Sequence, residues 1–169
     1  IGAPDSGLDA ALGYAQESGI PYGVGFIKNK YVGRTFIQGS QAQRESSVRI
    51  KLNAISSTVK GKRVVLVDDS IVRGTQLQET VDFLYENGAK SVHMRSACPP
   101  IMYGCKYLNF SSSKSEMELL SRQTIKKLEG DEGMNHLEEY ADGTTERGKC
   151  MLKKICEDLG FDSLGFQSL

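Results

Sequence analysis

One stretch constrains the fold more than any other, residues 63–75, which read RVVLVDDSIVRGT. Residues 64–67 form a continuous apolar run, which is typical of a parallel strand covered on both faces. Two carboxylates, Asp68 and Asp69, follow directly, and then a turn of small residues that reaches Gly74 and Thr75 before an expected helix. This order of strand, acid pair, turn and helix predicts an α/β fold with polar groups at the carboxyl edge of a parallel sheet.

The residue types around this turn favour a particular ligand. A helix N-terminus offers unpaired N–H groups and the positive end of the helix dipole, so it binds phosphate readily. Two neighbouring carboxylates suit the hydroxyls of a sugar or a hydrated Mg²⁺ ion. The combination predicts a pocket for a phosphorylated ribose. The structural alternative is an ordinary strand-to-helix turn with two exposed acids.

The stretch resembles the 5-phosphoribosyl-1-pyrophosphate (PRPP) motif of the phosphoribosyltransferases. The resemblance implies that Asp68 and Asp69 bind the ribose hydroxyls and Mg²⁺. It also implies that the following residues line or shape the pocket of the 5-phosphate group: Ser70, Arg73, Gly74, Thr75 and Gln76.

Two further motifs narrow the resemblance to the amidophosphoribosyltransferases. Residues 28–37, KNKYVGRTFI, are similar to the mobile catalytic loop of that family, and residues 48–53, VRIKLN, to the far end of the same loop. Residues 4–6, PDS, match the turn that grips pyrophosphate. The similarity is continuous from residue 1 to about 110, fades, and returns weakly over 155–169. The structural alternative for the basic loop is a solvated, charged segment.

The resemblance implies roles for the residues of these motifs. Four residues would act on the leaving pyrophosphate or seal the pocket: Lys28, Tyr31, Arg34 and Lys51. Asp5 and Ser6 would complete the PRPP site, and Ser6 would join Asp68 and Asp69 around Mg²⁺. Cationic residues on a loop that closes can neutralise a charged leaving group and exclude water.

The resemblance also implies the fold and the reaction. The fold is the type I phosphoribosyltransferase fold, a mostly parallel central sheet flanked by helices with a long mobile loop over the active site. The reaction joins ammonia to C1 of PRPP, giving 5-phosphoribosylamine and pyrophosphate, the first step of purine biosynthesis. In that family glutamine supplies the ammonia through an N-terminal glutaminase domain, purine nucleotides inhibit, and the proteins form homo-oligomers.

Residues 1–169 are expected to be one phosphoribosyltransferase domain and a fragment of a longer protein. The chain opens without Met, and the first strand and the glutaminase domain are expected to precede it. Two other functions stay open at this stage. One is a different type I phosphoribosyltransferase that acts on a nucleobase. The other is a PRPP- or nucleotide-sensing regulatory domain without turnover.

Composition excludes several partners. The chain has 21 basic and 21 acidic residues, so a zero net charge disfavours a nucleic-acid surface. No apolar run approaches the roughly 20 residues of a membrane span, and no signal peptide is visible, which predicts a cytoplasmic protein.

The four cysteines form no C-x-x-C pair, so a zinc ribbon is disfavoured. Cys105 falls where many amidophosphoribosyltransferases have one ligand of a structural iron–sulfur (4Fe–4S) cluster. The other ligands are not evident in this chain, so a cluster in the full-length protein stays open. His93, in an expected strand, is interpreted as a partly buried structural residue.

Periodicity and turn residues predict the remaining elements. Helices are expected over residues 8–18, 75–87, 116–127 and 149–159, and strands over 22–28, 91–97, 107–110 and 162–167. Residues 129–146 are expected to form a loop or short helices. Strands that alternate with helices of this length favour a parallel sheet.

Overall fold

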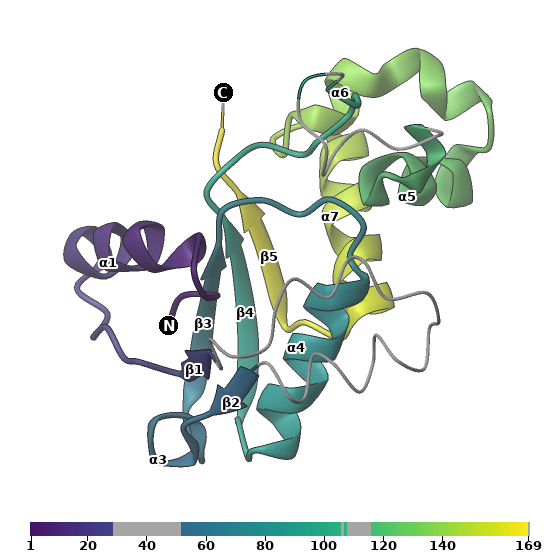
Figure 1. Ribbon diagram of the computed structural model, residues 1–169. Coiled ribbons are helices and arrows are strands. Elements are labelled where there is room, and N and C mark those ends of the chain that lie inside the picture. Colours follow the sequence, from purple (N-terminus) through teal and green to yellow (C-terminus); the bar gives the residue numbers. More distant parts are fainter. Residues whose placement is uncertain (29–51, 106, 108–115, 169) are drawn as a thin grey trace.

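The computed structural model describes residues 1–28, 52–105, 107 and 116–168. Three parallel strands form the central sheet in the order β3-β4-β5, and their bounds are Arg63–Asp68, Ser91–Ser96 and Ser163–Phe166. In register, Asp68 lies opposite Ser96, and Ser96 lies opposite Phe166. Because the strands are parallel, their carboxyl ends meet at one edge of the sheet (Figure 1). The sequence prediction of an α/β fold with a parallel sheet is therefore confirmed.

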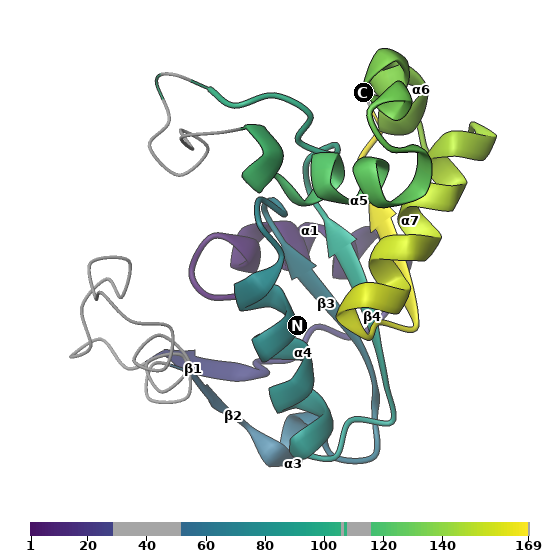
Figure 2. The same cartoon turned by 90° about the vertical axis from the view of Figure 1, so that its right-hand side faces the viewer.

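Helices cover the sheet from both sides. Helices α4 (Thr75–Glu86) and α7 (Glu146–Leu159) lie on one face, and α1 (Gly7–Ser18) lies against β3 on the other, as Figures 1 and 2 show from two directions. The core lies between the strands and the two-helix layer. Its fully buried residues are drawn from β3, β4, α4 and α7 and include Leu66, Val81, Leu84, Val92, Met94, Met151 and Ile155.

A second, two-stranded sheet lies beside the first. Strand β1 (Phe26–Lys28) pairs antiparallel with β2 (Leu52–Ala54), and the short helix α3 (Ser56–Val59) leads from β2 toward β3. The expected strand over residues 22–28 is therefore shorter than predicted. Within it, Gly25 contacts Ile1 so closely that a Cβ atom would lie 2.5 Å from Ile1 Cδ1, and residues 22–25 form no strand.

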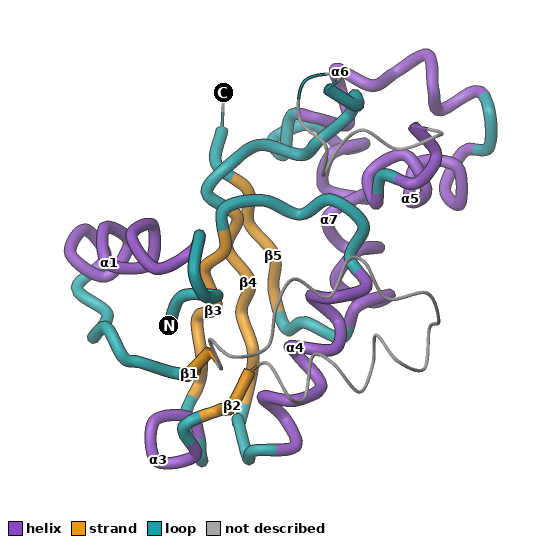
Figure 3. The backbone as a smooth tube through the Cα atoms, viewed as in Figure 1, coloured by secondary structure: helices purple, strands orange, loops and turns teal. Residues whose placement is uncertain are grey.

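The connection from β4 to β5 contains a group of short helices. These are η2 (Glu116–Glu118), α5 (Leu120–Glu129), η3 (Glu132–His136) and α6 (Leu137–Ala141), and Figure 3 shows them as a separate layer beyond the carboxyl edge. Residues 129–146 were expected to form a loop or short helices, and the structure contains the short helices η3 and α6 there. Helix α7 begins at Glu146, three residues before the predicted start, because the Thr145 side chain accepts a hydrogen bond from Gly148 N and caps it. The expected strand over 107–110 lies almost entirely outside the described residues.

The first residues of the chain run alongside β3. Ala3 N donates to Val67 O over 2.8 Å, and Val67 N donates to Ile1 O over 2.9 Å. This segment is parallel to β3, so residues 4–6 emerge at the same edge as Asp68 and Asp69. None of the helices in the described part of the chain combines the length and the apolar character that crossing a bilayer requires.

Candidate functional site

The acid pair lies where β3 ends. Asp68 is the last residue of β3, and its Oδ1 accepts a hydrogen bond from the Asp69 amide over 2.9 Å. Asp69 accepts hydrogen bonds from two hydroxyl groups, Ser6 Oγ at 2.8 Å and Ser70 Oγ at 3.0 Å. The Ala97 amide, just beyond β4, donates to the Asp68 carbonyl over 2.9 Å. Residues from three separate segments of the chain therefore hydrogen-bond to Asp68 or Asp69, and only Ala97 does so through the backbone carbonyl of Asp68.

The two carboxyl groups titrate differently because their surroundings differ. Burial raises the pKa of Asp68 to about 7, and the hydrogen bond and negative charge of Asp69 add to the rise. Burial also acts to raise the pKa of Asp69, but hydrogen bonds from Ser6, Asp68 and Ser70 outweigh it and hold that pKa below its ordinary value. The pair thus keeps one carboxylate ionised at neutral pH, and the second carboxyl gains or loses its proton near pH 7.

Residues 4–6 also contact the end of β1. The Lys28 ammonium forms an ion pair with the Asp5 carboxylate, while the next residue, Ser6, donates to Asp69. Ser6 occupies the N-cap position of α1, but its side chain makes no capping hydrogen bond there. Its hydroxyl is used instead to join the start of the chain to the acid pair. The structure therefore brings Asp5, Ser6 and Lys28 to the edge where Asp69 lies.

The turn after the acids, residues 70–75, leads directly into α4. Ile71, 4% exposed, anchors it in the core. Gly74 has a φ of 80°, which favours glycine, and occupies the N-cap position of α4. Thr75 and Gln76 begin this 12-residue helix and are exposed, so the first amides of α4 lie at an accessible helix N-terminus. The turn therefore has the local structure of an anion site next to two carboxylates.

Arg73 extends from the same turn but contacts another element. Its guanidinium forms an ion pair with Glu118 of η2, with 3.0 Å between Arg73 Nη2 and Glu118 Oε2. Sequence reasoning placed Arg73 in the phosphate loop and did not find Glu118. No local pattern indicates that residue, because residues 111–150 carry weak sequence signals and Glu118 is one of several acids among them.

Three of the predicted catalytic residues, Tyr31, Arg34 and Lys51, lie outside the described residues, together with most of the expected mobile loop. Lys28 is the one predicted catalytic residue that lies among the described residues.

The Phosphoribosyl transferase domain family matches residues 1–101, well over half of the chain, and the matched part contains β3, the acid pair and the 70–75 turn. The chain belongs to the phosphoribosyltransferase family. The type I fold predicted from the sequence is thereby confirmed, since the chain also superposes on solved phosphoribosylpyrophosphate amidotransferases.

This phosphoribosyltransferase is similar to proteins named amidophosphoribosyltransferase. It is 47% identical to the one from Mycobacterium bovis over 170 residues, which is 100% of this chain and 28% of that protein. It is 49% identical to the one from Bacillus subtilis over 136 residues, which is 80% of this chain and 28% of that protein. The chain thus spans less than a third of the length of these curated relatives.

The chain is also similar to a solved structure. It is described as glutamine phosphoribosylpyrophosphate amidotransferase from B. subtilis complexed with ADP and GMP, and it matches with a TM-score of 0.70 and 42% identity over 99% of this chain and 30% of its own. The alignments with this structure and with the M. bovis relative both include residues 111–150.

The cysteines do not form a cluster site in the described part of the phosphoribosyltransferase. Cys105 lies in the loop after β4, and within the described residues no three His, Cys, Asp or Glu side chains come together to hold a metal. The described surroundings of Cys105 therefore do not fit an iron–sulfur cluster. His93 is partly buried and lies within hydrogen-bonding distance of Ser91 and Ser163, the structural role expected from the sequence.

Proposed function

We propose that this chain is the phosphoribosyltransferase part of an amidophosphoribosyltransferase, which forms 5-phosphoribosylamine and pyrophosphate from PRPP and ammonia in the first step of purine biosynthesis. One observation carries the proposal: Ser6, Asp69 and the 70–75 turn meet at one sheet edge. The relatives named amidophosphoribosyltransferase support the choice of reaction within the family.

The proposed pocket assigns each part of PRPP to a different segment. Asp68 and Asp69 bind the ribose hydroxyls. The 5-phosphate lies in the 70–75 turn, where the Ser70 and Thr75 hydroxyls and the first amides of α4, including that of Gln76, can donate to its oxygens. Gly74 allows the positive φ that this turn contains, and Arg73 supports the turn through its ion pair with Glu118. The pyrophosphate group lies toward Asp5 and Ser6.

The reaction requires no protein nucleophile. The nitrogen lone pair of ammonia forms a bond to C1 of the ribose as the bond from C1 to the pyrophosphate oxygen breaks, and the nitrogen then loses a proton. We assign Lys28, Arg34 and Lys51 to neutralising the departing pyrophosphate and Tyr31 to sealing the pocket. Positioning and charge stabilisation then supply most of the rate enhancement.

The donor set at the acid pair fits Mg²⁺. One or two carboxylates together with substrate oxygens are the usual protein contribution to Mg²⁺ sites. Burial raises the pKa of the Asp68 carboxyl to about 7, and a cation bound beside it would favour its charged form. Asp68, Asp69 and the Ser6 hydroxyl would hold the ion, which would neutralise charge on the pyrophosphate group.

We further propose the partners that such an enzyme has. An N-terminal glutaminase domain of the same protein would supply ammonia from glutamine. Purine nucleotides would inhibit, which is supported by the description of the B. subtilis structure as a complex with ADP and GMP. The whole enzyme would be a cytoplasmic homo-oligomer.

The proposed function is tested by determining which nucleophile causes the release of pyrophosphate from PRPP. The chain is incubated with PRPP and Mg²⁺ and with either ammonium or a purine base, and pyrophosphate is measured. Release that depends on ammonium is expected. Release that depends on a base instead would identify a nucleobase phosphoribosyltransferase, and PRPP binding without any turnover would identify a regulatory domain.

Two variants test the residue assignments. Asp69→Asn should abolish Mg²⁺-dependent PRPP binding in calorimetry, whereas Asp82→Asn, a matched change at an exposed position of α4, should bind normally. Unchanged affinity of Asp69→Asn would refute the site. Lys28→Ala should lower turnover more than PRPP affinity, since its charge is assigned to the leaving group. The reverse pattern would limit Lys28 to binding the substrate.

A further inference from the structure

The 70–75 turn is contacted from behind by a segment distant in the sequence, the start of the α5 region. Glu118 of η2 forms the ion pair with Arg73, at 3.0 Å. Two residues later, the Leu120 amide donates a hydrogen bond to the Val72 carbonyl over 2.8 Å. Residues 72 and 73 of the turn are therefore each fixed by a polar contact with residues 118–120.

The next residue of the turn is fixed by packing. A Cβ atom on Gly74 would lie 3.2 Å from Leu120 Cδ1 and 3.3 Å from Leu159 Cδ1, so both leucine side chains pack close to the glycine backbone. Leu120 and Leu159 are 7% exposed and belong to the main core. Three consecutive residues of the turn are thus held by contacts with η2, α5 and α7.

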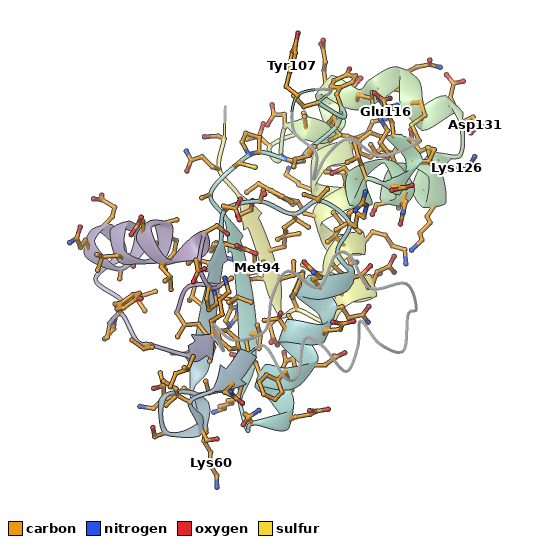
Figure 4. All side chains as sticks on the ribbon, viewed as in Figure 1. Lys60, Met94, Tyr107, Glu116, Lys126 and Asp131 are labelled. Atoms are coloured by element: carbon orange, nitrogen blue, oxygen red, sulfur yellow. The ribbon has the colours of Figure 1, made fainter. Side chains whose placement is uncertain are left out.

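The neighbouring acid Glu116 contacts a different part of the molecule. Glu116 forms an ion pair with Arg122 at 2.8 Å, and Arg122 donates to the Met102 carbonyl over 2.7 Å in the loop after β4. Figure 4 labels Glu116 at the end of the molecule opposite Lys60. Glu116 and Glu118 therefore belong to the same short helix, but only Glu118 contacts the 70–75 turn.

We propose that Glu118 is a positioning residue for the 70–75 turn. Glu118 acts through Arg73 and does not itself contact the ligand. This inference rests on the proposed function, in which the turn binds the phosphate of a phosphorylated ribose. A turn that is ordered before binding loses less conformational entropy when the ligand arrives. The side chains of Arg73 and Glu118 are 46% and 44% exposed, so their ion pair adds little to the stability of the fold. Its effect on binding is consequently separable from folding.

The experiment measures which ligands lose affinity in Glu118→Ala. By calorimetry with Mg²⁺, PRPP and ribose 5-phosphate should bind about fivefold more weakly than to the unaltered chain, the size of effect typical for coupled neighbours. Pyrophosphate, which does not use the turn, should bind equally well. Thermal unfolding should shift by no more than about 2 °C. Glu118→Gln keeps an acceptor for the guanidinium and should restore most of the affinity, and Glu116→Ala is the matched control and should bind normally.

A double-mutant cycle tests whether Glu118 acts through Arg73. In an Arg73→Ala background, adding Glu118→Ala should cause no further loss of ribose 5-phosphate affinity. An additional loss there, an equal loss for pyrophosphate, or unchanged affinity of Glu118→Ala would each overturn the positioning role. A gain in affinity would overturn it too, since Glu118 would then be withholding Arg73 from the phosphate. If the unaltered chain bound no PRPP, the proposed function itself would fail, which is a different result.

Discussion

Two aspartates at opposite edges of the same sheet have opposite electrostatic surroundings. At the amino edge, Asp162 precedes β5 and accepts hydrogen bonds from Tyr85 Oη at 2.6 Å and from the Val92 amide at 2.8 Å. These hydrogen bonds, that of Tyr85 first, hold the pKa of Asp162 below its ordinary value. At the carboxyl edge, burial raises the pKa of Asp68 to about 7. Hydrogen bonds favour the charged form of Asp162, whereas burial disfavours the charged form of Asp68.

The Asp162 carboxylate therefore stabilises the folded chain, whereas the charged form of Asp68 destabilises it. Asp162 ties α4, β4 and β5 together where the chain turns into β5. Asp68 is partly buried beside another acid, an arrangement that disfavours its charged form and that a cation or sugar hydroxyl would relieve. The two edges of the sheet therefore differ in how their carboxyl groups affect stability, and four variants can break or sharpen this contrast.

The largest effect is expected from Asp68→Asn. A raised carboxyl pKa means that the folded chain binds more protons than the unfolded chain between about pH 4 and 7, so wild-type stability falls as the pH rises through that window. Asn keeps the acceptor for the Asp69 amide and carries no charge. Urea unfolding should show the variant more stable by about 2–4 kcal/mol at pH 8, with the advantage vanishing near pH 4. Equal pH dependence of the two proteins would contradict the burial of this charge.

Asp162→Ala should have the opposite sign. Tyr85 and the Val92 amide lose their acceptor, so the free energy of unfolding at pH 7 should fall by about 2 kcal/mol. Because the pKa of Asp162 is lowered in the fold, this contribution is present above the unfolded pKa of about 3.9 and is lost as the pH falls through the folded value. Tyr85→Phe, which removes one of the two donors, should show about half the loss. No change in either variant would mean that the amino edge is not held by this carboxylate.

Ser6→Ala should change stability least, by about 0.5 kcal/mol, because its hydrogen bond to Asp69 is exposed. It should instead raise the pKa of Asp69, since one of the donors that stabilise the carboxylate is lost. A carboxyl titration followed by NMR measures this rise. An unaltered Asp69 titration would show that the start of the chain and the acid pair are not coupled.

The sequence was sufficient for the elements whose signals are local. The apolar run before Asp68 predicted β3, and the helix expected over residues 75–87 corresponds to α4, in which Leu77, Val81 and Leu84 are buried. The helix expected over residues 8–18 corresponds to α1, which Gly19 follows with a φ of 72°. In each case the deciding interaction is between residues close in the chain.

The contacts that complete the candidate site are not local and could not be predicted from periodicity. The Ser6 hydroxyl was expected near the metal site by family resemblance, but its donation to Asp69 depends on residues 1–3 running along β3. The Arg73–Glu118 ion pair depends on how the β4–β5 connection folds back onto the 70–75 turn. Neither leaves a pattern in the sequence, because tertiary packing alone brings the partners together.

The most direct test of the account is a crystal structure of the chain with PRPP and Mg²⁺ in the absence of ammonia. The account predicts ribose density with its hydroxyls against Asp68 and Asp69 and with its 5-phosphate within hydrogen-bonding distance of the amides and hydroxyls of the 70–75 turn. Ligand density elsewhere on the molecule, with only solvent at this edge of the sheet, would contradict it.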